Sequence, residues 1–278
     1  MHKRWSLPSK GVRVLLKLEG INKVFNEGTP DEKVALANIN LHLKPGDFVT
    51  IIGSNGAGKS TMMNMVSGAL TPDFGSILID GKQVTGLPEY KRSQFIGRVF
   101  QDPMAGTAPS MTIEENVALA YSRNKGRGLR IGVDKKRREF FKESLEMLGL
   151  NLENRLSAKV GLLSGGERQA LSLLMATFTK PSILLLDEHT AALDPSRAEL
   201  ITQITKYLVE KDKLTTLMVT HNMQQALDLG NRLIMMDKGQ IILEVGEDRK
   251  HELTIPDLMA EFERIRGEKM NSDRALLG

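Results

Sequence analysis

Cysteine is absent from this chain of 278 residues, which excludes disulfide bonds and thiolate metal sites and favours a reducing compartment. Aromatic residues make up only 5% of the sequence, and no apolar run approaches the roughly 20 residues of a membrane-spanning helix. The basic N-terminus has no apolar segment behind it, so the sequence predicts no secretory signal. A net charge of +4 is too small to indicate a nucleic-acid-binding protein. If the chain serves a membrane, we expect the membrane part to be another chain.

What the chain does contain is enough apolar residues for a packed core, 41% of the total, and one glycine-rich loop after a β-branched run at 49–52. A strand that breaks into such a loop and then opens a helix gathers backbone N–H groups around one point, where phosphate oxygens bind. The loop reads as a Walker A sequence and comprises Gly53, Ser54, Asn55, Gly56, Ala57, Gly58, Lys59, Ser60 and Thr61.

Two side chains of this loop carry chemistry. Lys59 has the length to bridge the β- and γ-phosphates of a nucleotide, and the Ser60 hydroxyl has the short reach that a Mg²⁺ ligand needs. An ordinary glycine turn ahead of a helix would explain the glycines, but it would not explain the strand, the spacing, the lysine and the serine together. The sequence therefore predicts a nucleotide site and leaves the choice of nucleotide open at this point.

Strand and helix patterns alternate along most of the chain, which predicts an α/β protein with a parallel sheet. Before the loop, two alternating segments within 12–43 predict an antiparallel β-layer. Residues 101–161 predict a mostly helical insertion, because Thr112 and Glu115 form a capping box and a later helix has apolar residues at Phe141 and Leu145.

We expect the following units within one domain. Residues 12–100 and 162–245 form the nucleotide-binding core with its antiparallel layer, and residues 101–161 form a helical subdomain. Residues 246–278 form a C-terminal helix, opening near Thr254, and a frayed tail.

A second candidate anion site follows the insertion, where Ser164, Gly165 and Gly166 open a helix. The first N–H groups of a helix lack partners and carry about half a positive charge, which attracts phosphate. Simple N-capping by Ser164 is the alternative, and it would explain the serine but neither glycine.

Three polar residues stand at the carboxyl ends of predicted core strands. The apolar run at 183–186 ends in Asp187 and Glu188, and His221 ends the strand that follows along the chain. Because two acids at the end of a buried strand are costly unless they serve a ligand, we expect them at the ligand-binding edge of the sheet.

In this fixed order, the Walker A loop, a strand-end Gln101, the segment L-S-G-G-E-R-Q, the Asp-Glu pair and a strand-end histidine closely resemble the ATP-binding subunit of ABC transporters. The resemblance spans residues 12–245, and the L-S-G-G-E-R-Q segment is its most specific part. It implies a P-loop NTPase fold with a RecA-like parallel core, an N-terminal antiparallel β-subdomain and an inserted helical subdomain. It also implies ATP and Mg²⁺ as cofactors and ATP hydrolysis as the reaction.

The resemblance assigns roles to the nucleotide-binding residues. Phe25 matches the aromatic residue that stacks on adenine, although tyrosine is commoner there, and the residues alone leave a core position for Phe25 equally open. Gln101 matches the residue that senses the γ-phosphate and Mg²⁺ and joins the core to the helical subdomain. In this family Ser164, Gly165 and Gly166 face the Walker A loop of a second copy.

The catalytic residues follow from the same resemblance. Asp187 would hold Mg²⁺ together with Ser60, and Glu188 would polarise the attacking water. His221 would contact the γ-phosphate and support Glu188, while Asp194 would communicate across the dimer. One departure is visible: His189 occupies a position that is usually proline, and we do not assign it as a second catalytic base.

The expected partners are a second copy in a head-to-tail homodimer, a transmembrane permease on separate chains and a solute-binding protein. The leading hypothesis is import of a solute, with an amino acid of the aromatic type as the substrate guess. The alternatives are an exporter motor and an ATPase that acts on nucleic acid or ribosomes. Proteins of the second class usually contain a long coiled coil or two cassettes in tandem, and this sequence has neither. We expect no nucleic-acid partner and a cytoplasmic, peripheral location on the inner face of the membrane.

Two surface segments carry further hypotheses. The loop at 102–111, which contains two prolines together with Met104 and Met111, has the composition of a socket for a short permease helix, unless both methionines pack inward. The basic run at 123–138 is read as a solvated helical face, with contact to anionic lipid headgroups as the alternative.

Overall fold

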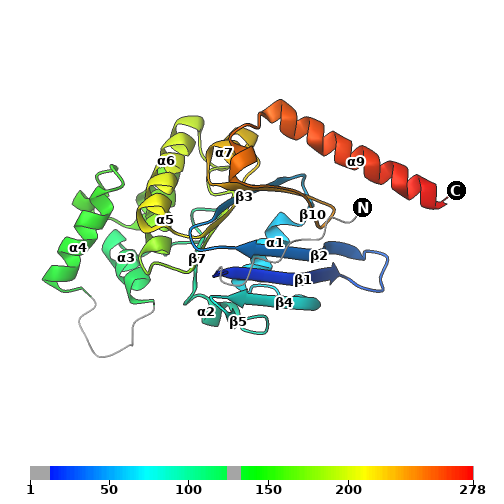
Figure 1. The fold of residues 1–278 in the computed structure, drawn as a ribbon. Coiled ribbons are helices and arrows are strands. Elements are labelled where there is room, and N and C mark those ends of the chain that lie inside the picture. The colour runs from blue at the N-terminus through cyan, green and yellow to red at the C-terminus, as the bar shows by residue number, and fades with distance from the viewer. Residues whose placement is uncertain (1–12, 124–132, 278) are drawn as a thin grey trace.

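The computed structural model describes residues 13–123 and 133–277, which form two β-sheets with helices around them (Figure 1). The larger sheet has the strand order β10-β9-β3-β8-β7-β6, and the smaller has the order β2-β1-β4-β5. The strands are β1 Leu16–Phe25, β2 Lys33–Leu43, β3 Phe48–Gly53, β4 Phe74–Ile79, β5 Lys82–Gln83, β6 Ile96–Val99, β7 Ile183–Asp187, β8 Thr216–Val219, β9 Arg232–Asp237 and β10 Gln240–Val245.

Helices cover the sheets and fill the connections between them. The α-helices are α1 Lys59–Ser67, α2 Glu89–Arg92, α3 Ile113–Ser122, α4 Lys135–Glu146, α5 Gly165–Thr177, α6 Pro195–Asp212, α7 Met223–Asp228, α8 Glu247–Lys250 and α9 Ile255–Leu277. Two single 3₁₀ turns, at Leu152–Asn154 and Val160–Leu162, precede α5.

The larger sheet sets the position of the functional residues. Strand β3 pairs in parallel with β8 and β9, and β7 pairs in parallel with β6 and β8, while β10 is antiparallel to β9. Because parallel strands end at the same edge, the loop after β3, the segment after β8 and the end of β7 come together there. The first four residues of β7 are buried, as a strand covered on both faces requires.

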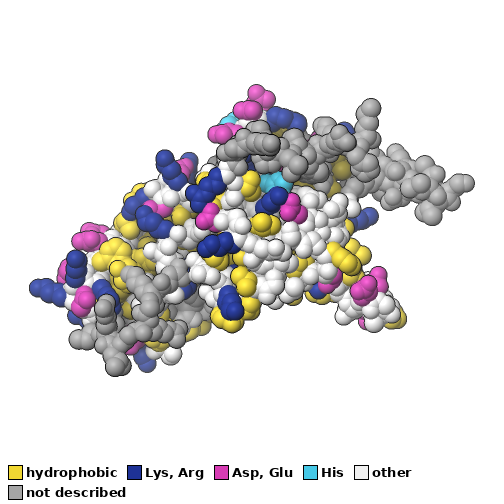
Figure 2. All heavy atoms as spheres, turned by 60° about the horizontal axis from the view of Figure 1, so that its bottom comes forward, with side chains coloured by type: hydrophobic (Ala, Val, Ile, Leu, Met, Phe, Trp, Pro, Cys, Tyr) yellow, Lys and Arg dark blue, Asp and Glu magenta, His cyan; other side chains and the backbone are white. Residues whose placement is uncertain are grey.

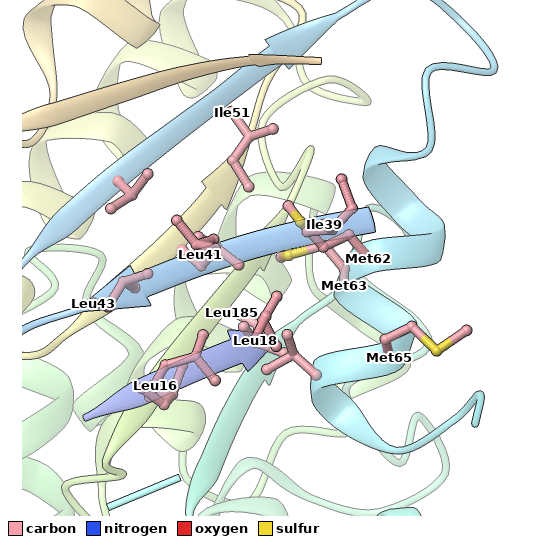
Figure 3. Close-up of a cluster of buried hydrophobic side chains, with 14 of the residues drawn as sticks. Leu16, Leu18, Ile39, Leu41, Leu43, Ile51, Met62, Met63, Met65 and Leu185 are labelled. Atoms are coloured by element: carbon pink, nitrogen blue, oxygen red, sulfur yellow. The ribbon is translucent and has the colours of Figure 1, made fainter. Parts of the chain in front are cut away.

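The smaller, antiparallel sheet packs against α1 and one face of the larger sheet. Figure 3 shows Met62 and Met63 of α1 among Ile39 and Leu41 of β2, with Leu185 of β7 nearby. The flexible thioethers fill the irregular space between a twisted sheet and a short helix. The packing of this cluster therefore fixes the helix that follows the glycine loop.

The opposite face of the larger sheet carries α5 and α6, and the helical insertion extends from it. Helices α3 and α4 lie between β6 and β7 in the chain and share a buried cluster with α5. Four of the few aromatic side chains join them, with ring centroids 5.4 to 6.4 Å apart, namely Tyr121, Phe140, Phe141 and Phe178. The capping box of Thr112 and Glu115 is present at the start of α3, as predicted.

The C-terminal end differs from the expectation. The tail predicted to be frayed is helical, because α9 continues to Leu277 and extends from the body of the molecule in Figure 1. Charged side chains of both signs are scattered over the face in Figure 2, and apolar ones show in several places, among them the end that carries α3 and α4. Among residues 13–123 and 133–277, no helix combines the length and the apolar character that crossing a membrane requires.

Candidate functional site

The glycine-rich loop joins β3 to α1, and close backbone contacts explain two of its glycines. Gly53 has φ +155°, and a Cβ atom there would lie 2.2 Å from the carbonyl oxygen of Met236. Gly58 has φ +100°, and its Cβ atom would lie 2.5 Å from the carbonyl oxygen of Ala35. Any other residue would displace neighbouring backbone, so the loop adopts this path only with glycine at both positions.

Lys59 begins α1 and folds back over the loop. Its Nζ atom donates to the carbonyl oxygens of Gly53 and Ser54 at 2.8 and 3.1 Å. Burial lowers the pKa of Lys59, while the nearby charges of Glu188 and Asp187 oppose that shift. No acidic residue lies in the first turn of α1, so the helix itself places no negative charge at its positive end.

A pocket of about 270 Å³ lies over this loop. It is bounded by the end of the smaller sheet, by the loop and α1, and by two strand-end residues of the larger sheet. The lining residues are Phe25, Lys33, Ala35, Asn55, Gly56, Ala57, Gly58, Lys59, Ser60, Thr61, Glu188 and His221. A larger hollow of about 480 Å³ lies between β10 and α9, but it contains none of the predicted site residues.

Glu188 and His221 form the polar wall of the pocket. The Nε2 atom of His221 lies 2.6 Å from Oε1 of Glu188, and the Glu188 side chain is only 12% exposed. Glu188 has φ +47°, a left-handed conformation that is unfavourable for a residue with a side chain. Such strain persists where the surroundings impose it, and here it turns the carboxylate from the end of β7 into the pocket.

Asp187 is held by a residue that sequence reasoning missed. Arg98 on β6 donates from Nη2 to Oδ2 of Asp187 at 3.2 Å and to Oδ1 of Asn64 at 2.8 Å. An arginine within the short apolar strand I-G-R-V was the signal that could have found it, because a cation on a largely buried strand needs partners.

Phe25 lines the pocket wall on the smaller sheet. The alternative that the sequence left open, a position in the hydrophobic core, is therefore not what the structure shows. Phe25 ends β1 opposite Lys33 of β2, and the Nζ atom of Lys23 lies 5.7 Å from the centre of the Phe25 ring. Lys33 was also missed, since nothing in its local sequence distinguishes it from other surface lysines.

The L-S-G-G-E-R-Q segment lies apart from the pocket, because none of its residues lines it. Ser164 caps α5, accepting from the Glu167 N–H at 3.3 Å, so the capping alternative describes its local geometry. A Cβ atom on Gly166 would lie 3.1 Å from Cδ of Arg197, which gives this glycine a packing reason that the sequence did not predict. Arg155 of the insertion binds Glu167 at 2.7 Å.

Three further predicted residues occupy separate places. Gln101 is exposed and does not line the pocket. Asp194 caps α6 and accepts from the Arg197 N–H at 3.2 Å. His189 is buried, its Nε2 atom lies 3.0 Å from the Thr205 hydroxyl, and burial lowers its pKa to about 4. The His189 imidazole is therefore enclosed in the protein and does not line the pocket.

Comparison with known proteins identifies the family to which this site belongs. A sequence profile described as "ABC transporter" matches residues 36–191. The chain belongs to the ABC transporter family. Within that family it is an ATP-binding subunit and an ATPase, which confirms the predictions of family, cofactor nucleotide and reaction. The fold class is likewise confirmed.

Individual relatives of this ABC cassette include transport proteins. The tyrosine transport ATP-binding protein of Clostridioides difficile (strain R20291) is 42% identical over 249 residues, covering 90% of this chain and 99% of that protein. The energy-coupling factor transporter ATP-binding protein EcfA2 of Clostridium perfringens (strain 13 / Type A) is 33% identical, covering 82% of this chain and 79% of that protein.

Solved structures of ATP-binding cassettes have the same fold. The dimeric structure of a cassette in a post-hydrolysis state bound to ADP and Pi is 33% identical, with a TM-score of 0.72, and covers 84% of this chain and 99% of that one. A cbiO1 structure from Clostridium perfringens, described as part of the transporter complex cbiONQ, is 27% identical, with a TM-score of 0.71, and covers 95% and 97%.

Proposed function

We propose that this cassette hydrolyses ATP in composite sites formed by a head-to-tail homodimer and thereby drives a separate membrane permease. One observation carries the proposal: the glycine loop, Glu188 and His221 line one pocket, whereas the helix start at Ser164 lies outside it. A single chain thus has a phosphate cradle and a water-activating pair, but its second predicted anion site is left for another copy. A solved dimer of a similar cassette with ADP and Pi supports this arrangement.

The proposed chemistry begins with the triphosphate in the cradle of loop N–H groups at the start of α1. Lys59 exchanges its contacts with Gly53 and Ser54 for phosphate oxygens, and Phe25 stacks on the adenine. Glu188 then orients and polarises the water that attacks the γ-phosphorus, with His221 holding the carboxylate. Ser164 and the glycines beside it, from the partner copy, stabilise the charge on the γ-oxygens.

The residues beside the loop also fit Mg²⁺. Ser60 lines the pocket, and Asp187 lies at the end of β7, so a hydroxyl and a carboxylate oxygen are available, with Gln101 as the third proposed ligand. Within the described ranges there is no cluster of three or more His, Cys, Asp or Glu, and Mg²⁺ with a nucleotide does not require one, since phosphates and water supply its other ligands. When bound, Mg²⁺ neutralises charge on the β- and γ-phosphates.

The proposed cargo process is solute import, and an aromatic amino acid is the proposed substrate class. The name of the relative from Clostridioides difficile, a tyrosine transport ATP-binding protein, supports both. In this proposal the cassette lies at the cytoplasmic face of the membrane on permease chains, and a solute-binding protein delivers the cargo.

The loop at 102–111 is the proposed permease contact, and residues 101–161 are proposed to move as a helical subdomain around it. Met104 is 41% exposed, so at least this methionine does not pack inward as the alternative required. Its Sδ atom lies 2.6 Å from Nη1 of Arg168 in the L-S-G-G-E-R-Q segment, which links the loop to the second anion site. Of the basic run, residues 124–132 lie outside the described residues.

Affinity purification from membranes tests the transport proposal. A tagged chain carrying Glu188→Gln is solubilised with ATP, and co-purifying proteins are identified by mass spectrometry. Import predicts recovery of integral membrane subunits and, after crosslinking, a solute-binding protein, with tyrosine, phenylalanine and tryptophan as the first ligands for that protein in a thermal-shift assay. Recovery of ribosomal proteins or nucleic acid in place of membrane subunits would contradict the proposal.

A further inference from the structure

Arg98 is largely enclosed in the protein, and the reaction proposed above assigns it no role. Its side chain is 12% exposed and lies between α1 and the carboxyl end of β7. From Nη2 it donates to Asn64 at 2.8 Å and to Asp187 at 3.2 Å, and from Nη1 it donates to the Ser67 hydroxyl at 3.1 Å. The guanidinium carbon also lies 4.7 Å from the centre of the Phe100 ring, one residue before Gln101.

The two α1 contacts lie on the helix face that also carries Ser60. Residues 60, 64 and 67 follow the i, i+4, i+7 spacing, which aligns side chains along one stripe of an α-helix. Arg98 therefore contacts Asn64 and Ser67, which lie one and two turns after Ser60 on the same helix face. With the same guanidinium it contacts Asp187 at the end of β7. A planar fork with several donors can make these bonds together, which a lysine ammonium cannot do in the same geometry.

We propose that Arg98 is a positioning residue for the metal step: it fixes the separation between Ser60 and Asp187 and holds one Asp187 oxygen so that the other is directed to Mg²⁺. This inference rests on the metal site proposed above. Carboxylates that bind metals are themselves held by hydrogen bonds, and loss of such a partner typically weakens metal binding by about 10–100-fold. The contact with the Phe100 ring extends the same support to the backbone leading into Gln101.

A second buried arginine provides a matched control. Arg92 also braces α1, but it donates to the carbonyl oxygens of Met65 and Val66 at the end of the helix and has no contact with Asp187. A brace that acts only on the stability of α1 would give the same phenotype at both arginines. A positioning role for the metal would separate them.

The experiment measures metal binding apart from turnover. Binding of a fluorescent ATP analogue to the purified chain is titrated with Mg²⁺, and bound Mn²⁺ is counted by electron paramagnetic resonance. For Arg98→Met we expect about 10–100-fold more Mg²⁺ at half-saturation, unchanged analogue binding in EDTA and loss of the Mn²⁺ signal at limiting metal. Arg98→Lys should give a smaller shift, and Arg92→Lys should lower the melting temperature without changing the Mg²⁺ requirement.

The outcomes distinguish the inference from the metal site itself. Asp187→Asn must raise the Mg²⁺ requirement, and if it does not, the proposed metal site is wrong. Suppose that Asp187→Asn raises the Mg²⁺ requirement but that Arg98→Met and Arg98→Lys need no more Mg²⁺ than the wild type. In that case only the role of Arg98 is overturned, including the case in which Arg98→Met needs less Mg²⁺ because a repelling cation is gone. If Arg98→Met does not fold, Arg98→Lys decides: its half-saturating Mg²⁺ must rise several-fold.

Discussion

His221 and Glu188 are in contact, with Nε2 of the imidazole 2.6 Å from Oε1 of the carboxylate. The two residues come from the ends of neighbouring parallel strands, β8 and β7, so the sheet itself sets their separation. The Glu188 backbone N–H donates to the Val219 carbonyl oxygen at 3.0 Å, which anchors the strained residue to the adjacent strand. The carboxylate is therefore oriented by the fold before any nucleotide arrives.

Glu188→Gln tests this assignment. The amide keeps the volume of the side chain but is a far weaker proton acceptor, so we expect ATP hydrolysis to fall by about 100-fold or more. ATP binding should remain, and a dimer trapped with ATP should appear on size-exclusion chromatography. A variant with wild-type phosphate release would show that Glu188 is not the residue that activates water.

Ser164 should act on the nucleotide of the partner copy. We expect Ser164→Arg and Lys59→Ala each to abolish hydrolysis alone, whereas a mixed dimer of the two keeps one intact composite site. Mixing equal amounts of the variants should restore about a quarter of the wild-type ATPase rate if one site can act alone, because about half of the dimers are mixed and each mixed dimer has one intact site of two. The control is the chain that carries both substitutions, which has no intact site in any dimer. No recovery in dimers shown to contain both chains would place the site within one chain.

Met104→Asp should uncouple hydrolysis from transport. A charge on this exposed loop disfavours docking of an apolar helix. The pocket is untouched, and an aspartate can still accept a hydrogen bond from Arg168, so ATPase activity and ATP-driven dimerisation should remain while permease binding is lost. Met147→Asp is a matched control, because Met147 is 38% exposed and contacts Lys211 of α6, away from the loop. Normal transport by cells that express Met104→Asp at wild-type levels would remove the loop from the coupling surface.

The buried His189 should make stability depend on pH. Its pKa is lowered from 6.5 to about 4, so between these values the unfolded chain binds a proton that the folded chain does not. The free energy of unfolding therefore decreases as the pH falls from 6.5 to 4, by up to about 3 kcal/mol from this residue. His189→Gln should flatten the urea-unfolding curves over this range, and an unchanged pH dependence would refute the assignment.

The sequence predicted best where one chemical requirement determines several residues together. The glycine loop before α1 and the buried strand before Asp187 were both found, because phosphate binding and full burial each restrict the residue types at every position. The apolar spacing of α4 was equally informative: Phe141 and Leu145 are fully buried, as the period predicts.

The contributions that were missed come from contacts distant in sequence. Arg98 takes its partners from α1 and β7, and the reason for Gly166 lies in Arg197 of the next helix. Neither residue has a local pattern that reveals its partner. The extent of α9 was also missed, since the residues after 265 have no clear apolar stripe on which a helix prediction depends.

The bonds from Lys59 to its own loop bear on the thermodynamics of nucleotide entry. The ammonium already has two carbonyl acceptors, from Gly53 and Ser54, and in the proposed mechanism it gives them up for phosphate oxygens. The enthalpy that Lys59 contributes is then a difference between two sets of charge-assisted hydrogen bonds, which is smaller than either set alone. If Lys59 binds the β- and γ-phosphates as proposed, a nucleotide with too few phosphates would leave those two bonds intact and would gain nothing from the lysine.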